Sequence, residues 1–330
     1  MAILLSRSDE VRLLDMAEVI DIMARAFTEL AQGQVALPQR TPLPVPEHAG
    51  LSLTMPCLLK DMGALGLKVV TVYGENPARY GLPTIMATVL LQDARTGATL
   101  AIMEGGYLTA MRTGATSGLA TRLLARKDAE VHTIIGTGGM ARTQIQGVGC
   151  ARAIRKLILC SVDPIGVRQA FRDSLRDIVS AEITLAEDPG EAVGAADIVT
   201  LITNSSSPVL EGRWLKPGTH INGIGSHTPK MREADTLAVQ RSKVVCDVLD
   251  NCRAEAGDLI VPAQLGEWSW DKVHGSLGDV VTGRVPGRES ESEITFFKST
   301  GIAAQDISTA AYLHRKALAL GLGTEFDFLN

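Results

Sequence analysis

The chain has 330 residues, of which 45% are hydrophobic and 21% charged, and its formal net charge is −5. This is the composition of a globular protein of about two domains. It excludes the basic face that nucleic-acid binding requires and the Lys/Arg cluster of a polybasic membrane anchor.

Targeting and metal signals are also missing from the sequence. The N-terminal apolar run is too short for a secretory signal, and no apolar stretch approaches the ~18 residues of a membrane span. The five cysteines are scattered without a C-x-x-C motif, so we expect reduced thiols and a cytoplasmic location. The histidines lack metal-ligand spacing, and we expect no metal. Small molecules and further copies of the chain are the expected partners.

The first hundred residues predict a small α+β domain. Asp15, followed by Glu18, is typical of a helix start, and apolar residues then recur at helical spacing until Gly33. The proline-rich stretch 34–50 is extended, either as an ordered loop or as an edge strand. Alternating hydrophobicity predicts strands within residues 51–73 and 82–103.

A helix is predicted from Leu108 to Arg126. Gly114, Ala115 and Gly118 give it a face of small residues that suits close backbone packing, and it leads from the first domain into the second.

After Asp128, short apolar runs alternate with helical stretches, which indicates a doubly wound parallel sheet of the Rossmann type. The last helical pattern runs from Ser308 to Leu329 and returns to the first domain. We therefore expect an α+β substrate-binding and dimerisation domain at residues 1–118 with 308–330, and a dinucleotide-binding domain at 119–307.

A glycine motif joins the first strand of the second domain to its helix. The segment has the G-x-G-x-x-A pattern of dinucleotide-binding loops, in the strand–loop–helix context that gives this pattern its specificity. Such a loop brings backbone amides and a helix N-terminus to a pyrophosphate. The expected cofactor-binding residues here are Gly136, Thr137, Gly138, Gly139, Met140 and Ala141.

The residue that discriminates between NAD and NADP is expected at the end of the next strand. Ser161 stands where an NAD enzyme prefers an acid, and a neutral side chain leaves room for a 2′-phosphate. No arginine follows, however, and Asp163 is close. The sequence therefore predicts NADP or NAD, with a slight preference for NADP.

Several segments together resemble the ornithine cyclodeaminase/mu-crystallin family. The resemblance covers nearly the whole chain and rests on the order and spacing of these blocks: Met55-Pro56, GALGLKVVTVYGENPARYGLP, GGYLTAMRTGATSGLAT, IIGTGGMARTQ, ADIVTLITNSSSPVL, INGIGSHTPKMREAD, AEAGDL and SLGDVVTGRVPGRESESEITFFKSTGIAAQD. It implies a homodimer joined through the first domain, a nicotinamide cofactor in the second, and the substrate at the cleft between them.

The resemblance also implies a cationic clamp for the carboxylate of an amino or imino acid, at positions matching Arg40, Lys68 and Arg112. Each has a structural alternative: a surface-loop arginine, a solvent-facing lysine and a solvated helix cation, respectively. Met55 is expected to line the same pocket.

His227 and Thr54 depart from the cyclodeaminases of this family. Those enzymes have an acid in the G-x-D-x-P context, where this chain has His227, and commonly another acid where it has Thr54. Both differences argue against binding and cyclising a second amine. His227 suits proton transfer near neutral pH, so we expect it to be catalytic with Lys68, although a merely structural role is the alternative.

The resemblance places further cofactor-binding positions near the nicotinamide, at Thr113, Thr203, Asn204, Ser205, Lys298 and Ser299. The favoured hypothesis is an NAD(P)H-dependent reductase of a small α-imino acid, such as the cyclic ketimine 1-pyrroline-2-carboxylate. The alternatives are ornithine cyclodeaminase, an alanine-type dehydrogenase, and a crystallin-like binding protein without turnover.

Overall fold

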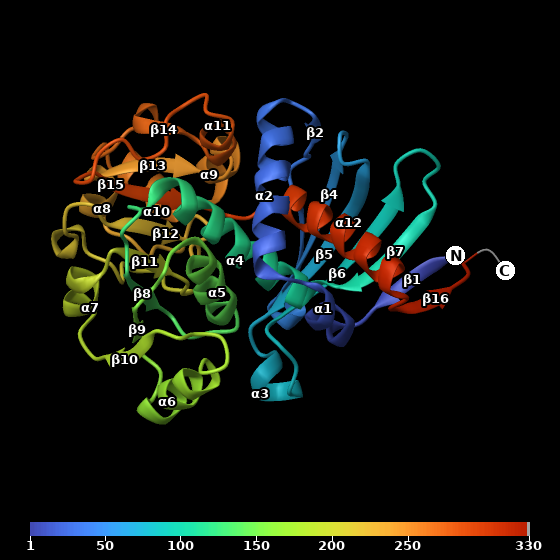
Figure 1. Ribbon diagram of the computed structural model, residues 1–330, viewed down its shortest axis with the longest axis horizontal. Helices are drawn as coiled ribbons and strands as arrows, with labels where there is room; N and C mark the ends of the chain where they lie inside the picture. The colour runs from blue at the N-terminus through green and yellow to red at the C-terminus, as the bar shows by residue number, and fades with distance from the viewer. Residues whose placement is uncertain (329–330) are drawn as a thin grey trace. The chain divides into compact units, whose positions relative to one another are not determined.

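The structure is a computed structural model that describes residues 1–328. The chain forms two compact units (Figure 1): unit 1 comprises residues 1–112 together with those from 302 onward, and unit 2 comprises residues 113–301. The sequence prediction placed both boundaries later, at 118/119 and 307/308. The first boundary falls inside one continuous helix, so the local sequence carries no break to mark it.

Unit 1 is built on a sheet that is antiparallel except where β1 runs parallel to β7. Its described strands follow the order β16-β1-β7-β6-β5-β4-β2, with β3 also paired to β4. The proline-rich stretch supplies the edge strand β3. The terminal strands β1 and β16 were not predicted. The strands are β1 (Ala2–Leu5), β2 (Val35–Ala36), β3 (Thr41–Val45), β4 (Gly50–Leu59), β5 (Ala64–Tyr73), β6 (Ile85–Asp93), β7 (Thr99–Glu104) and β16 (Thr324–Phe326).

Helices α2 and α12 pack together, and α12 covers one face of this sheet (Figure 1). Asp15 accepts a hydrogen bond from the amide of Glu18 (3.1 Å), so the predicted helix start is confirmed. The last helix was placed too late: it ends at Leu320 and is capped by Gly321, whose φ of 62° suits glycine. Leu329 lies outside the described residues. The unit 1 helices are α1 (Arg7–Leu13), α2 (Met16–Ala31), α3 (Asn76–Tyr80) and α12 (Ala303–Leu320).

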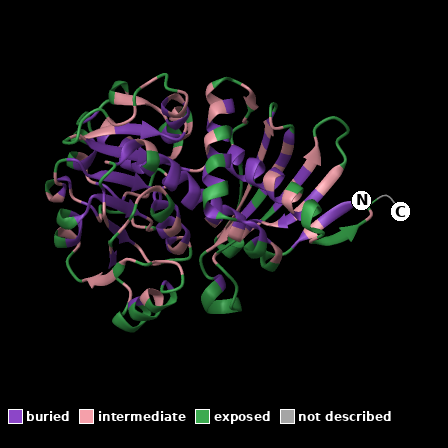
Figure 2. Ribbon diagram, in the orientation of Figure 1, coloured by how far each residue is buried: buried purple, intermediate pink, exposed green. Residues whose placement is uncertain are grey.

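Unit 2 has the predicted doubly wound parallel sheet. Its described strands follow the order β10-β9-β8-β11-β12-β15-β13-β14, and every pair is parallel. Figure 2 shows that most of these strands are buried. The strands are β8 (Val131–Ile135), β9 (Lys156–Cys160), β10 (Glu182–Ala186), β11 (Ile198–Leu201), β12 (His220–Gly223), β13 (Ser242–Cys246), β14 (Val273–Ser276) and β15 (Ile294–Lys298).

The small-residue face of α4 (Gly105–Leu124) packs closely on α5, as predicted. A Cβ at Gly114 would collide with the carbonyl oxygen of Thr143, and one at Gly147 would collide with the carbonyl oxygen of Gly114. The other unit 2 helices are α5 (Ala141–Ala151), α6 (Ile165–Ser174), α7 (Pro189–Ala195), α8 (Thr236–Gln240), α9 (Leu249–Glu255), α10 (Gly257–Gln264) and α11 (Leu277–Val281).

The remaining features concern membrane and metal sites. No helix within residues 1–328 is long and apolar enough to cross a membrane. The same described residues hold no group of three or more His, Cys, Asp or Glu side chains that could bind a metal ion. None of the five cysteines, all within the described residues, forms a disulfide.

Candidate active site

The loop between β8 and α5 has the geometry of a dinucleotide-binding loop. Gly136 has a φ of 109°, and a Cβ there would lie 2.5 Å from the carbonyl oxygen of Ile202. Gly138 and Gly139 are exposed, with no atom within 4 Å of their Cβ positions. No side chain caps the start of α5, whose first residue, Ala141, is buried. An open glycine loop that leads into an uncapped helix start suits a pyrophosphate, so the residues present fit the predicted cofactor.

The strand order places this loop at the reversal point of the sheet. Strands β9 and β10 lie on one side of β8, and β11, β12 and β15 lie on the other. Dinucleotides bind across the carboxyl ends of the strands at such a point, one mononucleotide over each half. Residues after β9 therefore lie on the adenosine side, and residues after β11 and β12 lie on the nicotinamide side.

A carboxylate lies on the adenosine side, two residues beyond the position the sequence analysis favoured. Ser161 and Thr137 each donate a hydroxyl hydrogen bond to Asp163 Oδ2, both at 2.6 Å. The hydrogen bond from Ser161 lowers the pKa of Asp163 most, and the one from Thr137 lowers it further. The carboxyl group of Asp163 is therefore an anion at neutral pH. Asp163 is thereby fixed beside the glycine loop.

Thr203, Asn204 and Ser205 follow β11, and His227 follows β12. Asn204 is exposed, whereas Thr203, Ser205 and His227 are half-buried. The Nδ1 atom of His227 lies 2.7 Å from the carbonyl oxygen of Gly225. Because a carbonyl only accepts, Nδ1 carries the proton, and Nε2 is the basic atom of the neutral ring.

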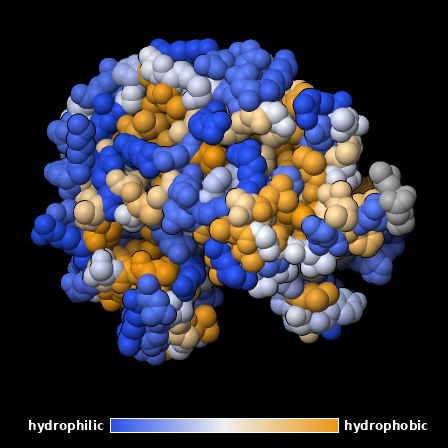
Figure 3. Space-filling model, turned by 45° about the vertical axis from the view of Figure 1, so that its right-hand side comes forward, coloured by the Kyte–Doolittle hydropathy of each residue, from blue (hydrophilic) through white to orange (hydrophobic). Residues whose placement is uncertain are grey.

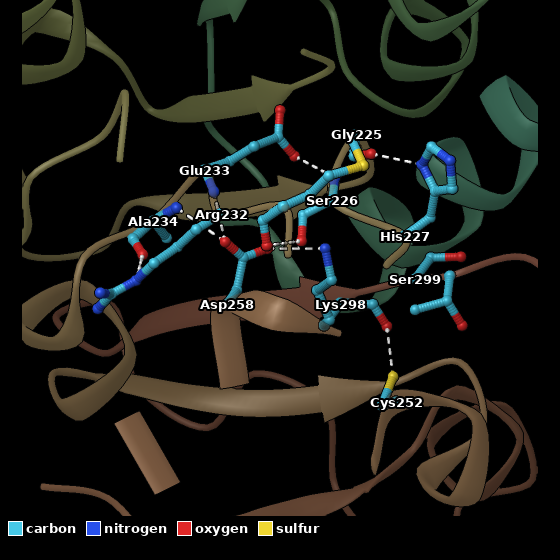
Figure 4. Close-up of polar contacts among 12 residues, drawn as sticks. Gly225, Ser226, His227, Arg232, Glu233, Ala234, Cys252, Asp258, Lys298 and Ser299 are labelled. Carbon is cyan, nitrogen blue, oxygen red and sulfur yellow. Dashed lines mark hydrogen bonds and ion pairs between the residues drawn. The ribbon is translucent and has the colours of Figure 1, made fainter. Parts of the chain in front are cut away.

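Lys298 is buried deeper than the sequence analysis expected. The sequence analysis assigned it to cofactor binding, but its side chain has no exposed surface and its Nζ lies 2.8 Å from Asp258 Oδ2 (Figure 4). A buried ammonium needs such a partner, so Asp258 keeps Lys298 charged, and a direct contact of Lys298 with the cofactor stays a prediction. Ser299 is also buried, and its hydroxyl donates to Asp247 Oδ2 at 2.7 Å.

Two buried cations share one carboxylate in unit 1. Lys68 Nζ lies 2.8 Å from Asp306 Oδ2, and Arg112 Nε lies 2.9 Å from Asp306 Oδ1. Lys68 and Arg112 are 2% and 6% exposed, which excludes the solvent-facing alternatives. Thr109 lies 3.5 Å from Lys68 Nζ and Asp306 Oδ1, and Gln305 accepts a second hydrogen bond from Arg112.

The sheet and two helices place these groups together. Lys68 shares the α12-covered face of β5 with Ala64 and Val70, because side chains alternate along a strand. Burial lowers the pKa of Lys68 to about 8; the nearby Asp306 opposes this decrease, and Arg112 adds to it. Lys68, Arg112 and Asp306 together carry one positive charge when ionised, which suits an anionic ligand.

The other predicted substrate residues differ in their surroundings. Met55 is buried on β4 directly opposite Lys68. Arg40 is half-buried between β2 and β3, and its charge acts on Lys68. Thr113, predicted to bind the cofactor, is buried in α4 immediately after Arg112.

The sequence analysis missed the roles of the buried acids. Asp306 was noted only as part of a family block, and Glu233 was not singled out. Both are fully buried. The available signal was a charged residue within an apolar pattern: Asp306 begins the run D-I-S-T-A-A at the start of a helix.

The chain is similar to known proteins over nearly its whole length. A family model described as ornithine cyclodeaminase/mu-crystallin family matches residues 2–320. A Delta(1)-pyrroline-2-carboxylate reductase of Bacillus cereus is 38% identical over 327 residues, which cover 99% of this chain and 100% of that protein.

Two solved structures are also similar to this chain in fold and sequence. Thermococcus litoralis Delta(1)-pyrroline-2-carboxylate reductase, in complex with NADH and L-proline, is 42% identical with a TM-score of 0.94, covering 98% of this chain and all of that one. An archaeal alanine dehydrogenase dimer with bound NAD is 32% identical with a TM-score of 0.93, covering 99% of each chain.

Proposed function

Because the chain belongs to the ornithine cyclodeaminase/mu-crystallin family, we propose that it reduces a small α-imino acid to the amino acid with a reduced nicotinamide cofactor. The proposed substrate class is the cyclic ketimines, such as 1-pyrroline-2-carboxylate. The observation that carries the proposal is the buried pair Lys68 and Arg112, joined through Asp306, because it suits a substrate carboxylate. The similarity to reductases of this imine supports it.

Each unit has its own part in the proposed reaction. The loop Gly136–Ala141 holds the pyrophosphate, and the bound cofactor supplies the hydride. Lys68 and Arg112 hold the carboxylate of the imine at a fixed angle, and Asp306 orients both cations. We propose that His227 holds a water or protonates the product nitrogen.

The cofactor preference is also a proposal. Ser161 alone favoured NADP slightly. Asp163, fixed by Ser161 and Thr137, weighs against that preference, because its charge repels a 2′-phosphate and can accept from a 2′-hydroxyl. We therefore propose that NADH is preferred, in agreement with the NADH complex of the Thermococcus litoralis relative.

The alternatives have weaker support. Cyclisation of ornithine would need acids where this chain has Thr54 and His227. An alanine-type dehydrogenase shares the clamp and the cofactor, and the similarity to alanine dehydrogenases keeps it as the second candidate. A buried clamp together with an intact cofactor loop disfavours a binding protein without turnover.

We propose a homodimer that assembles through unit 1. The face of β5 opposite Lys68 has half-buried apolar residues, and Val69, Ile85 and Met86 are exposed. Apolar residues also remain exposed on the face of the molecule in Figure 3. The archaeal alanine dehydrogenase relative is a dimer. A cytoplasmic location is proposed because the five cysteines form no disulfide within the described residues.

Three assays of the purified protein test the function. We expect oxidation of NADH, and more slowly of NADPH, with 1-pyrroline-2-carboxylate, together with formation of proline. We expect no proline or ammonia from ornithine with NAD. Turnover of ornithine at about 1–10³ per second would overturn the proposal in favour of an ornithine cyclodeaminase. Turnover of pyruvate and ammonia at such a rate, without turnover of the imine, would favour an alanine-type dehydrogenase.

A further inference from the structure

Three charged side chains form a second ionic cluster, inside unit 2 (Figure 4). Glu233, Asp258 and Lys298 each have no exposed surface. Asp258 Oδ1 accepts from the amides of Glu233 (2.6 Å) and Ala234 (2.9 Å), and its Oδ2 lies 2.8 Å from Lys298 Nζ. The proposed mechanism uses none of these charges directly.

Glu233 joins the ends of two neighbouring parallel strands. Its Oε1 accepts from the amide (2.6 Å) and the hydroxyl (2.8 Å) of Thr203, which follows β11. Its Oε2 accepts from the amide of Ser226 (2.7 Å), which follows β12. The loops approach so closely that a Cβ at Gly225 would collide with both Thr203 and Glu233. One carboxylate thus fixes both loops on the nicotinamide side.

The cluster carries one negative charge when all three groups are ionised. Burial and then Asp258 raise the pKa of Glu233 to about 7, while Lys298 lowers it. The guanidinium of Arg232 bonds to the carbonyl of Ala234 and the hydroxyl of Thr236, not to either carboxylate. The cluster is therefore an anion above about pH 7, and charges in the interior are weakly screened.

The two states of the cofactor differ in charge at this end. The oxidised nicotinamide ring is a cation, the reduced ring is neutral, and positive charge develops on the ring as the hydride leaves. A fixed negative charge behind its binding loops stabilises the developing cation without reorganisation. Thr203 and Ser226 lie on the half of the sheet where the nicotinamide mononucleotide binds.

We propose that Glu233 is a positioning residue that, supported by Asp258 and Lys298, fixes the nicotinamide loops and biases the site toward the oxidised ring. The bias favours hydride departure to the imine. The inference rests on the proposed function only for the class of cofactor, because it does not depend on which imine is reduced.

The test is the ratio of the dissociation constants of NAD⁺ and NADH, measured by calorimetry at about pH 8, where Glu233 is ionised. For Glu233→Gln we expect NAD⁺ to weaken about tenfold more than NADH. Asp258→Asn removes one charge without touching Thr203 or Ser226, and it should shift the ratio in the same direction. Glu289→Gln is the matched control, because this exposed acid pairs with Lys243 at the amino end of the sheet.

The outcomes separate the two proposals. Equal weakening of both cofactors, or an unchanged ratio in both cluster variants, would show a structural role only and overturn the inference. If Glu233→Gln does not fold, Asp258→Asn decides. Failure of the wild-type protein to bind either cofactor would overturn the proposed function and the inference together, whereas binding without imine reduction would leave the inference intact.

Discussion

The two units bury ionic clusters of opposite composition. In unit 1 one carboxylate, Asp306, serves two cations, Lys68 and Arg112. In unit 2 one cation, Lys298, serves two carboxylates, Asp258 and Glu233. Buried ion pairs contribute little to stability by themselves, so an unbalanced cluster calls for a functional reason. The sign of each imbalance suits a different ligand: an imino-acid carboxylate in unit 1 and an oxidised nicotinamide in unit 2.

Removing a cation from the unit 1 cluster should have the largest effect on activity. We expect Arg112→Ala or Lys68→Ala to lower kcat/KM for the imine about 10–150-fold, the effect of losing one charge-assisted contact. NADH affinity, measured by fluorescence titration, should remain close to that of the wild type. The control is Arg79→Ala, which removes an exposed arginine of α3. Near-normal kinetics in both clamp variants would mean that the substrate binds elsewhere.

Removing Asp306 tests whether this acid keeps Lys68 charged at neutral pH. The ammonium of Lys68 is present below its pKa of about 8 and is lost as the pH rises through that value, so kcat/KM should fall above about pH 8. Asp306 opposes the decrease in this pKa. In Asp306→Asn the fall should therefore begin at lower pH, with about tenfold lower kcat/KM at neutral pH. An unmoved pH profile would exclude Asp306 as the partner that keeps Lys68 charged.

Lys68→Arg is the control for the substrate's own titration. Arginine stays charged throughout the range, so the loss of activity assigned to Lys68 should vanish in this variant. A loss that persists unchanged would belong to deprotonation of the imine instead.

The clusters also show what sequence can and cannot predict. The cofactor loop Gly136–Ala141 was predicted because its residues are consecutive and its strand–loop–helix context is local. The role of Asp306 was missed because its partner, Lys68, is distant in the chain and only the packing of α12 on β5 joins them. Glu233 was missed because its hydrogen-bond donors are mainly backbone amides, which carry no sequence signal.

The same distinction holds for the fold. Regular periodicity predicted helix α2 and the alternation of strands and helices in unit 2. It failed for β1 and β16, which are short strands at opposite ends of the chain that pair with each other. Such strands depend on a long-range partner more than on their own composition.

A fourth acid, the half-buried Asp163, lies on the adenosine side of the proposed cofactor site. We expect Asp163→Ser to raise the affinity for NADPH relative to NADH about tenfold, because the repulsion of a 2′-phosphate is removed. The two dissociation constants measure this, and Asp173→Ser, which removes an exposed acid of α6, is the control. An unchanged ratio would assign the discrimination to other residues and return weight to the expectation based on Ser161.

Replacement of His227 should have the smallest effect on activity, because of the charge that the substrate already carries. An iminium substrate already carries the proton on its nitrogen, so the reduction depends on the held carboxylate and the placed hydride more than on an acid. We expect His227→Ala to lower kcat about 2–5-fold, well below the usual contribution of general acid–base catalysis, which is about 10²–10⁴-fold. His274→Ala is the matched control, because that histidine of unit 2 also bonds to a carbonyl oxygen, that of Pro286.

A loss of about 10²-fold or more in His227→Ala alone would show that proton transfer limits the reaction and would make His227 the main acid of the site. An effect equal to that of the control would leave His227 with the loop-capping role that its hydrogen bond to Gly225 already provides.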